Sequence, residues 1–410
     1  MTSSSNSYIS TNFAQTTMEK HLYTQKVYPT INNNDLLEFR VPPNQKGQVD
    51  LGNVLLHFRV KLPVPADKTA KVLPQNFFGP KQFRSLEVRI NGEAISRRSC
   101  ANEYFLATYF QYLINYNIEY QLTGLRTVGM FDYAQSKTAE LERYDEGTRA
   151  AFISSRTNLG STEYEIVMPV DSTVFNTNNL LPSNTGLDLS FERNKPSTST
   201  IVTKTTTVSN EVMELKDCYL MVPFKHSEEM FQQERNAIER PLKIKYDEFF
   251  IKRFNIPKGS SSVMMSDILT GVLPTKLFWG LQTIYSYSGS NRVSSTRFNR
   301  CGVKKANLYI NGQEADDYPV TMNEQHVSVP FVKFLESTNQ YQNGYMGRTL
   351  NLREYEQMNM ILSATLQTES GSVSFEFDFD DAVTDDLVLI VCGLFDRTLK
   401  IDNHRNFQIT

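Results

Sequence analysis

The chain has 410 residues and a net charge of −3 at pH 7. This length suggests about two to three domains, and the near-neutral balance argues against a protein that holds nucleic acid by neutralising many phosphates. Hydrophobic residues make up 40% of the chain, and its 26 Phe and 20 Tyr favour β-strands. The four cysteines are far apart, which excludes the usual zinc spacings and disfavours a disulfide scaffold.

No targeting or membrane-spanning segment is expected. Residues 1–14 are rich in Ser, Thr and Asn and lack the apolar stretch of a signal peptide. The longest apolar run, residues 387–394, is far too short to span a bilayer. The chain also has no Asn-x-Ser/Thr glycosylation acceptor. We therefore expect a soluble intracellular product.

Residues 1–34 are predicted to be an N-terminal arm rather than part of a domain, because they are polar and contain Pro29 and a run of Asn. Such a segment either frays or orders against a neighbouring subunit. It has no basic cluster, so it is not expected to bind nucleic acid.

Alternation of apolar and polar residues predicts strands from Leu37 onward. In residues 54–62 the apolar side chains face one way, while His57, Arg59 and Lys61 face the other. His57 is therefore expected on the solvent face, without a ligand role. Further strands of the first half are predicted at residues 83–90, 164–170, 187–191 and 215–224. Residues 198–207, rich in Thr and Ser, form either an edge strand or a surface loop.

A strand that runs into Ile-Asn-Gly occurs twice, at residues 88–95 and 308–315. Asn-Gly strongly favours a hairpin, because a type I′ turn needs φ > 0 at both central residues. Two unrelated hairpins can share this common dipeptide, but similar strand patterns surround both copies. We therefore predict two β-domains of the same kind, with structural turns in equivalent hairpins at Asn91, Gly92, Asn311 and Gly312.

One clear helix is predicted at residues 102–116, where aromatic and aliphatic residues recur at spacings of three and four. Asn102 suits the N-cap position. An aromatic stripe of this kind is more often core than a cofactor site, so we expect the helix to cover an open end of the first domain. Residues 227–240 are predicted to form a short helical connector.

The second half repeats the strand-rich pattern. Two strand-like pieces lie within residues 242–256, and further strands are predicted at residues 272–284, 306–310, 360–366, 373–379 and 387–394. Polar residues 286–300 and 331–347 are expected to form long loops. Many short strands with little helix favour paired sandwiches or jelly rolls over barrels and propellers.

No pattern indicates catalysis. The five histidines are scattered, and the chain lacks the GxSxG, P-loop, GxGxxG and HExxH motifs. The acidic run at residues 378–386 is the best candidate for a calcium site or a carboxylate pair. However, it lacks the Gly and the terminal Glu of an EF-hand loop, so a solvated acidic turn is preferred. We predict no catalytic, cofactor-binding or metal-binding residues.

Three stretches carry a family resemblance. Residues 104–116 read Tyr-Phe-Leu-Ala-Thr-Tyr-Phe-Gln-Tyr-Leu-Ile-Asn-Tyr and are followed by Gly-Met-Phe at 129–131. Ile-Val-Met-Pro-Val-Asp at 166–171 precedes Leu-Leu-Pro-Ser-Asn-Thr-Gly at 180–186, and Val-Leu-Pro-Thr-Lys-Leu-Phe-Trp-Gly-Leu stands at 272–281. In this order they resemble the double jelly-roll major capsid proteins of Polinton/Maverick elements, adintoviruses and virophage-like viruses. The long Thr-rich and Ser-rich loops depart from that family's pattern.

The resemblance implies an all-β fold of two tandem eight-stranded antiparallel jelly rolls with short helices in loops. The expected divisions are an arm at 1–34, a first jelly roll at 35–235, a second at 236–402 and a tail at 403–410. It further implies a viral major capsid protein that forms homotrimeric, pseudo-hexameric capsomers. With penton and minor capsid proteins, these would build an icosahedral shell around double-stranded DNA in the host nucleus or cytoplasm. The alternative is a jelly-roll minor capsid or spike protein, or a carbohydrate-binding surface protein.

Overall fold

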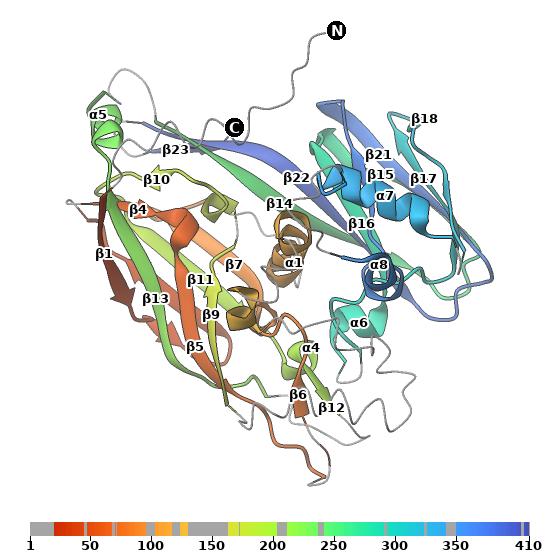
Figure 1. Cartoon of the computed structure of the whole chain (residues 1–410), viewed down its shortest axis with the longest axis horizontal. Coiled ribbons are helices and arrows are strands. Elements are labelled where there is room, and N and C mark those ends of the chain that lie inside the picture. The colour runs from red at the N-terminus through yellow and green to blue at the C-terminus, as the bar shows by residue number, and fades with distance from the viewer. Residues whose placement is uncertain are drawn as a thin grey trace.

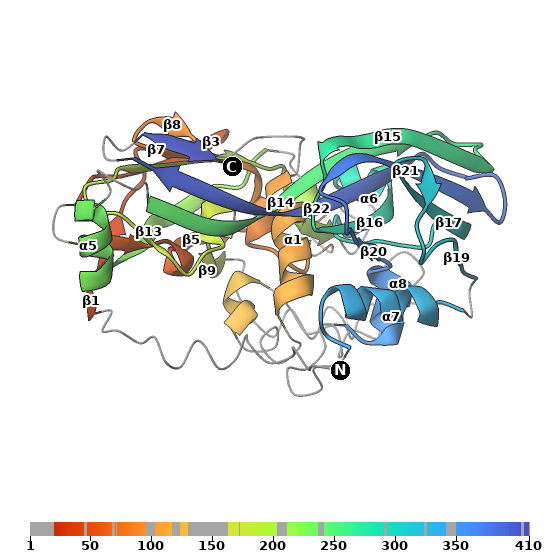
Figure 2. The same ribbon diagram turned by 90° about the horizontal axis from the view of Figure 1, so that it is seen from above.

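The computed structural model describes residues 20–44, 47–67, 70, 72–95, 103–116, 124–129, 163–171, 173–202, 211–236, 242–290, 293–323, 326–341, 350–402 and 406–409. These residues form two β-sandwich halves that lie side by side, with helix α1 (Glu103–Asn115) between them (Figure 1). Figure 2 shows the two sheets of each half as successive layers.

Each half contains two antiparallel sheets. In the first half, sheet 1A has the order β1 (Lys20–Val27), β13 (Leu215–His226), β5 (Leu55–Lys61) and β9 (Glu163–Pro169). In the same sheet β4 (Gln48–Asp50) also pairs with β13, and β10 (Leu180–Leu181) pairs with β4. Sheet 1B has the order β2 (Ile31–Asn32), β3 (Leu36–Val41), β11 (Leu187–Arg193), β7 (Phe83–Ile90) and β8 (Glu93–Ala94).

The second half repeats this arrangement. Sheet 2A has the order β14 (Leu242–Ile256), β22 (Leu387–Ile401), β16 (Lys276–Thr283) and β20 (Leu362–Thr365), with β23 (Phe407–Ile409) paired to β22. Sheet 2B has the order β15 (Ser262–Val272), β21 (Ser370–Phe379), β17 (Val303–Ile310) and β18 (Gln313–Glu314), with β19 (Val320–Thr321) beside β17. A small separate sheet pairs β6 (Val72–Pro74) with β12 (Thr200–Val202).

Strand order is the same in the two halves. Sheet 1A corresponds to sheet 2A, because the order β1-β13-β5-β9 matches β14-β22-β16-β20. Sheet 1B corresponds to sheet 2B, because the order β3-β11-β7-β8 matches β15-β21-β17-β18. The described chain is therefore two tandem antiparallel jelly rolls with short helices in the connections. The predicted fold class is confirmed.

Helices occupy the connections. Among the described residues, the other α-helices are α4 (Pro196–Ser199), α5 (Glu228–Asn236), α6 (Ile284–Ser288), α7 (Ser328–Ser337) and α8 (Leu352–Met358). Short 3-10 turns occur at η1 (Leu51–Asn53), η2 (Pro80–Gln82), η3 (Gly124–Val128) and η5 (Thr173–Phe175).

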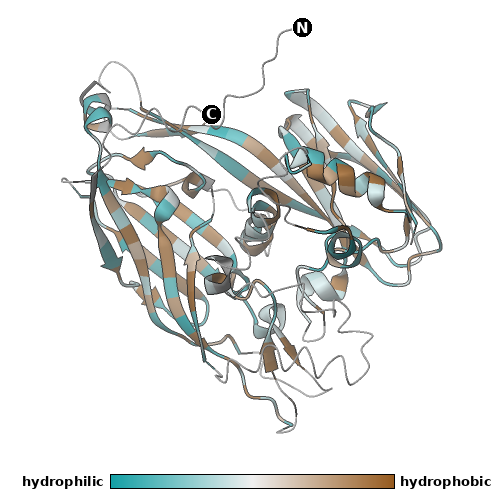
Figure 3. Ribbon diagram, viewed as in Figure 1, coloured by the Kyte–Doolittle hydropathy of each residue, from teal (hydrophilic) through white to brown (hydrophobic). Residues whose placement is uncertain are grey.

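The cores lie between the two sheets of each half. Apolar and polar bands alternate along strands of the first half in Figure 3, as expected for a sheet with one buried face. Phe58 of sheet 1A meets Phe83 of sheet 1B edge to face at 5.7 Å. In the second half, the single Trp279 packs on Phe375 of the opposite sheet at 4.7 Å.

The two Asn-Gly turns have the same geometry. Asn91 and Gly92 have φ of 50° and 86° between β7 and β8, and Asn311 and Gly312 have φ of 54° and 77° between β17 and β18. In each turn the Asn side-chain oxygen accepts a hydrogen bond of 2.8 Å from a neighbouring strand, at Gly186 N or Ser372 N. The Asn backbone N–H donates back to that same residue's carbonyl.

Most predicted strands and both predicted helices are present, but the structure differs from four expectations. Within the predicted arm, residues 20–27 and 31–32 are strands β1 and β2, and within the predicted tail β23 pairs with β22. The predicted loop at 331–347 contains the end of α7. The two strand-like pieces at 242–256 are one continuous strand. Residues 1–19 lie outside the described part, and the domain boundaries remain a proposal.

His57 is also placed differently from the prediction. Its side chain is only 6% exposed and stacks on Tyr219 at 4.3 Å. Nδ1 lies 2.9 Å from the carbonyl oxygen of Asp217, and Nε2 lies 2.8 Å from Glu165 Oε1. The hydrogen bond to His57 lowers the pKa of the Glu165 carboxyl. Cross-strand neighbours therefore cover a residue that alternation alone assigns to solvent.

The hairpin geometry predicts the effect of replacing either turn glycine. A Cβ at Gly92 or Gly312 would meet no atom within 4 Å, so the cost of Gly→Val comes from the positive φ alone. We expect Gly92→Val and Gly312→Val each to lower the free energy of unfolding by about 1–2 kcal/mol, measured by urea denaturation. Gln313→Val, at an exposed strand position, is the control and should be nearly neutral. Unchanged stability in both glycine variants would contradict this geometry.

Candidate functional site: the junction between the halves

Helix α1 lies at the centre of the junction and has almost no solvent-facing side. All but three of its residues are buried, including Thr108 and Gln111. A helix that is apolar on every side has to be enclosed by other elements. α1 packs on β7 and η2 of the first half and on β14 of the second. It therefore joins the two halves, whereas the sequence predicted a cover over the first domain alone.

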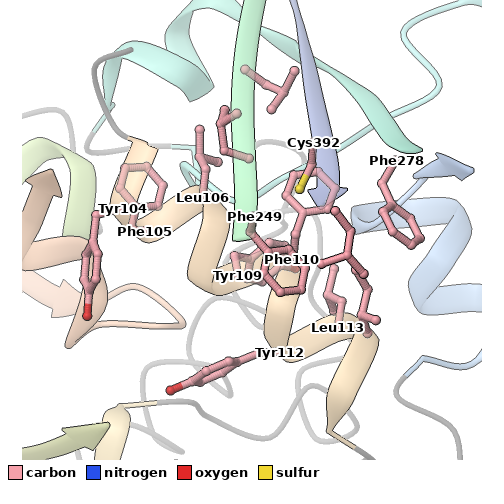
Figure 4. Packing of buried hydrophobic residues seen from close by; sticks show 14 of the residues in the cluster. Tyr104, Phe105, Leu106, Tyr109, Phe110, Tyr112, Leu113, Phe249, Phe278 and Cys392 are labelled. Atoms are coloured by element: carbon pink, nitrogen blue, oxygen red, sulfur yellow. The ribbon is translucent and has the colours of Figure 1, made fainter. Parts of the chain in front are cut away.

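Aromatic contacts hold α1 against the second half. Figure 4 shows Phe110 beside Phe249 and Cys392, while Tyr112 points away from this group. Phe298, fully buried, stacks on Tyr109 at 6.3 Å and meets Phe110 at 5.5 Å. On the other side of the helix, Tyr112 packs edge to face on Phe77 of the first half at 5.0 Å.

Polar side chains from the second half bind α1 at two points. The Tyr109 hydroxyl donates to Asn359 Oδ1. Gln340 Nε2 donates to the carbonyl oxygens of Leu113 and Ile114, at 3.1 and 3.2 Å. These carbonyls belong to the last turn of α1, which cannot satisfy them within the helix. Residues far along the chain thus complete the end of α1.

A buried polar network forms a second connection. Lys81 Nζ donates to Gln75 Oε1 at 2.9 Å, to Ser294 Oγ at 3.2 Å and to Thr296 Oγ1 at 3.1 Å. Gln75 Oε1 also accepts from Ser295 N at 3.1 Å. Residues 294–296 come from the segment predicted as a long exposed loop. That expectation is wrong here, because first-half polar groups bind and bury them.

A long ribbon supplies the third connection. β14 and β22 pair without interruption along all 15 residues of each strand and run from the second half toward the first (Figures 1 and 2). Near the first half, Thr177 Oγ1 donates to the carbonyl oxygen of Lys245 at 2.7 Å. Asn176 Nδ2 donates to the carbonyl oxygen of Asp247 at 3.2 Å.

Asp171 is a buried carboxyl at the inner side of α1. It accepts hydrogen bonds from the Tyr112 hydroxyl at 2.5 Å and from Gln111 Nε2 at 3.4 Å. Gln111 also donates to Asn176 Oδ1 at 2.7 Å, which extends the connection to β14. Burial raises the pKa of Asp171 from 3.8 to about 6. Burial, together with the nearby Asp171 charge, also raises the pKa values of Tyr104 and Tyr112. No ion pair to Asp171 occurs among the described residues.

The residues singled out in the sequence lie elsewhere. The Asn-Gly turns are at hairpin tips and take no part in the junction's described hydrogen bonds. In the acidic run, Asp380 pairs with Arg300 at 2.5 Å and Asp386 Oδ1 accepts from Lys258 N at 2.8 Å. Across the described ranges, no group of three or more His, Cys, Asp or Glu side chains is placed to hold a metal ion.

The described cysteines are free thiols within the fold. Burial raises the pKa of Cys218 to about 11 and that of Cys301 to about 12, and it also raises the pKa of Cys392. Because the thiolate is the reactive form, these residues are poor nucleophiles. The junction itself is built from apolar packing and hydrogen bonds.

Solved structures share this architecture. A chain of the Sputnik virophage, solved by cryo-EM, aligns with a TM-score of 0.62 and 12% identity, covering 96% of this chain and 89% of the other. VP54 of PBCV-1 aligns at 0.57 with 9% identity, covering 96% of both chains. The mavirus major capsid protein aligns at 0.53 with 9% identity, covering 100% of this chain and 96% of its own.

The chain has the double jelly-roll fold. No protein-family model and no curated protein matches the sequence. Among the described residues, no helix is both long and apolar enough to cross a membrane.

The junction predicts coupled unfolding of the two halves. Trp279 is the only Trp and reports on the second half, whereas far-UV circular dichroism reports on both. In the parent chain we expect the two urea curves to coincide. Phe298→Ala removes the ring that packs on α1, so we expect a loss of about 3–5 kcal/mol and separation of the curves. Tyr285→Ala, at a 60% exposed aromatic, is the control. Coincident curves and a loss below about 1 kcal/mol in Phe298→Ala would refute the coupling.

The environment of Asp171 predicts how stability changes with pH. Its raised pKa means that the folded chain favours the neutral carboxyl. The stability that the neutral Asp171 carboxyl contributes to the folded chain is fully present below about pH 4 and is lost as the pH rises through about 6. Asp171→Asn should therefore flatten the pH dependence of unfolding between these values, by at most about 3 kcal/mol. Urea denaturation across this pH range measures the free energy of unfolding of the parent chain and the variant, and Asp381→Asn, at an exposed position, is the control. An unchanged slope in Asp171→Asn would exclude this assignment.

Proposed function

We propose that the chain is a viral major capsid protein whose homotrimers act as pseudo-hexagonal tiles of an icosahedral shell. The observation that carries this proposal is the rigid joining of two equivalent jelly rolls around the buried helix α1. Three such chains would present six similar units around a ring, and cyclic association closes without forming filaments. The shared fold with the mavirus major capsid protein over its whole length supports the same role.

The sheet packing and the net charge of the chain agree with a structural role. Its sheets bury one face against each other, and both halves keep most backbone groups paired within sheets. A net charge of −3 suits a capsid shell that encloses double-stranded DNA without binding its phosphates tightly. On this proposal the chain is not an enzyme and uses no cofactor, and its partners are other copies, penton proteins and minor capsid proteins.

The viral group is proposed from the sequence. The aromatic helix at 104–116 and the 166–186 and 272–281 stretches resemble capsid proteins of Polinton/Maverick elements and adintoviruses. Assembly in the host nucleus or cytoplasm follows from that placement.

Expression of the full chain tests the proposed function. We expect a stable species of three times the mass of the 47.0 kDa chain, measured by light scattering, and shell-like particles in electron micrographs. Removing residues 1–19, which precede β1, should leave the trimer but reduce assembly into larger particles. A monodisperse monomer at micromolar concentration in both low and high salt would overturn the capsid proposal. Glycan binding by that monomer would instead favour a carbohydrate-binding surface protein.

A further inference from the structure

Inside the chain, the outer face of sheet 2A is covered by helices from both halves. α1 of the first half packs on β14, and α7 of the second half packs on β20. Phe278 of β16 meets Phe334 of α7 at 6.4 Å. As a result, the central residues of β22 are buried on both sides. Sheet 2A is thus a layer enclosed between its own sandwich core and a cover of helices.

Sheet 1A has the same strand order, and two adjacent cross-strand rows on its outer face are largely apolar. One cross-strand row consists of Met221, Leu55 and Pro169, and the next consists of Tyr219, His57 and Val167. Their neighbours along the strands, including Leu56 and Leu220, point inward and are fully buried. Side chains alternate between faces, so both rows face away from the core. Every member except His57 is partly exposed.

Little of the described chain covers these rows. In Figures 1 and 2, no described α-helix lies over β13 and β5 as α7 lies over β16 and β20. Tyr28, at the border of the rows, is 66% exposed and lies 6.1 Å from Tyr219. An apolar outer face of this kind is what α1 and α7 cover on the equivalent sheet 2A.

The second half carries an exposed apolar surface of its own. α7 buries Phe331, Phe334 and Leu335, while Val329 is 60% exposed and Val332 is half-buried. Positions 329 and 332 are three apart and share the side of α7 opposite its buried face. Leu352, at the start of the adjoining α8, is 41% exposed. We call Val329, Val332 and Leu352 the α7–α8 surface.

α1 and α7 occupy corresponding places in the two halves. α1 follows the hairpin β7–β8, and α7 follows the hairpin β17–β18. α1 continues beyond its own half to cover sheet 2A of the next half. α7 packs on β20 and β16 of its own half, and its remaining exposed side is not covered by the described part of the first half.

We propose that the α7–α8 surface of one copy covers the outer face of sheet 1A of a second copy, repeating between chains the contact that α1 makes with sheet 2A within the chain. This inference rests on the proposed self-assembly and names its contact. The two surfaces differ, so the association is head to tail, and in the proposed trimer three such contacts complete the ring. The two surfaces also carry opposite charges. Glu336 is exposed on the same side of α7 as Val329 and Val332, and Lys26 pairs with Met221 on sheet 1A.

Charge substitutions at the two surfaces test the contact. Leu55→Glu and Val329→Glu should each weaken association at least tenfold, measured as the concentration of half-dissociation by sedimentation or light scattering. Val272→Glu is the matched control, since Val272 is 66% exposed on sheet 2B, away from both surfaces. Trp279 fluorescence and circular dichroism confirm that each variant is folded. If Val329→Glu associates like the parent chain, the proposed contact is wrong.

Cross-linking distinguishes this contact from other occupants and does not depend on Leu55→Glu folding. Leu55→Cys and Val329→Cys proteins are prepared separately, mixed, and treated with a short bis-maleimide. We expect a covalent dimer in the mixture and little in either protein alone or in the parent chain, whose described cysteines are buried or nearly so. A dimer from Val329→Cys alone would indicate a symmetric contact and overturn the proposal. Trimers that form without the mixed cross-link would refute this contact while leaving the proposed function intact; absence of any oligomer would refute both.

Discussion

The architecture depends on helix α1, which is buried on all sides. Buried aromatic and aliphatic side chains contribute roughly 1.5–3 kcal/mol each, and α1 carries several on opposite faces. Phe110 and Leu113 lie with the second half, while Tyr104 and Tyr112 pack with the first. Separating the halves would expose one set or the other. The two sandwiches are therefore held as a single body by apolar burial around α1.

Hydrogen bonds at the junction determine its geometry more than its strength. Each contributes only about 1 kcal/mol net, but an unpaired buried group costs more than that. Gln340 satisfies the end of α1, and Gln75 and Lys81 satisfy the 294–296 segment. A shifted arrangement of the halves would leave these groups without partners. The junction consequently has one favourable arrangement, as a rigid building unit requires.

The sequence was most informative where side chains repeat with a regular period. Period-two alternation located most strands, and spacings of three and four located α1, because these patterns reflect one-sided burial. β1 was missed because it is a largely polar strand whose partner, β13, lies far along the chain. The burial of residues 294–298 was missed because nothing local distinguishes a buried Ser-rich segment from an exposed one. For α1, the sequence predicted a cover over the first domain, because the spacing of three and four indicates one buried face; burial against the second half was missed.

The pairing of distant strands also has a consequence for how the chain folds during synthesis. Lys20 of β1 pairs with His226, so sheet 1A is incomplete until nearly all of the first half has been made. Leu242 of β14 pairs with Ile401, so the ribbon forms only when the last strands leave the ribosome. Contacts of such long range form slowly and leave strand edges open in the meantime. The nascent chain therefore carries unpaired strand edges through most of translation, which is the state in which β-rich chains are most prone to aggregate.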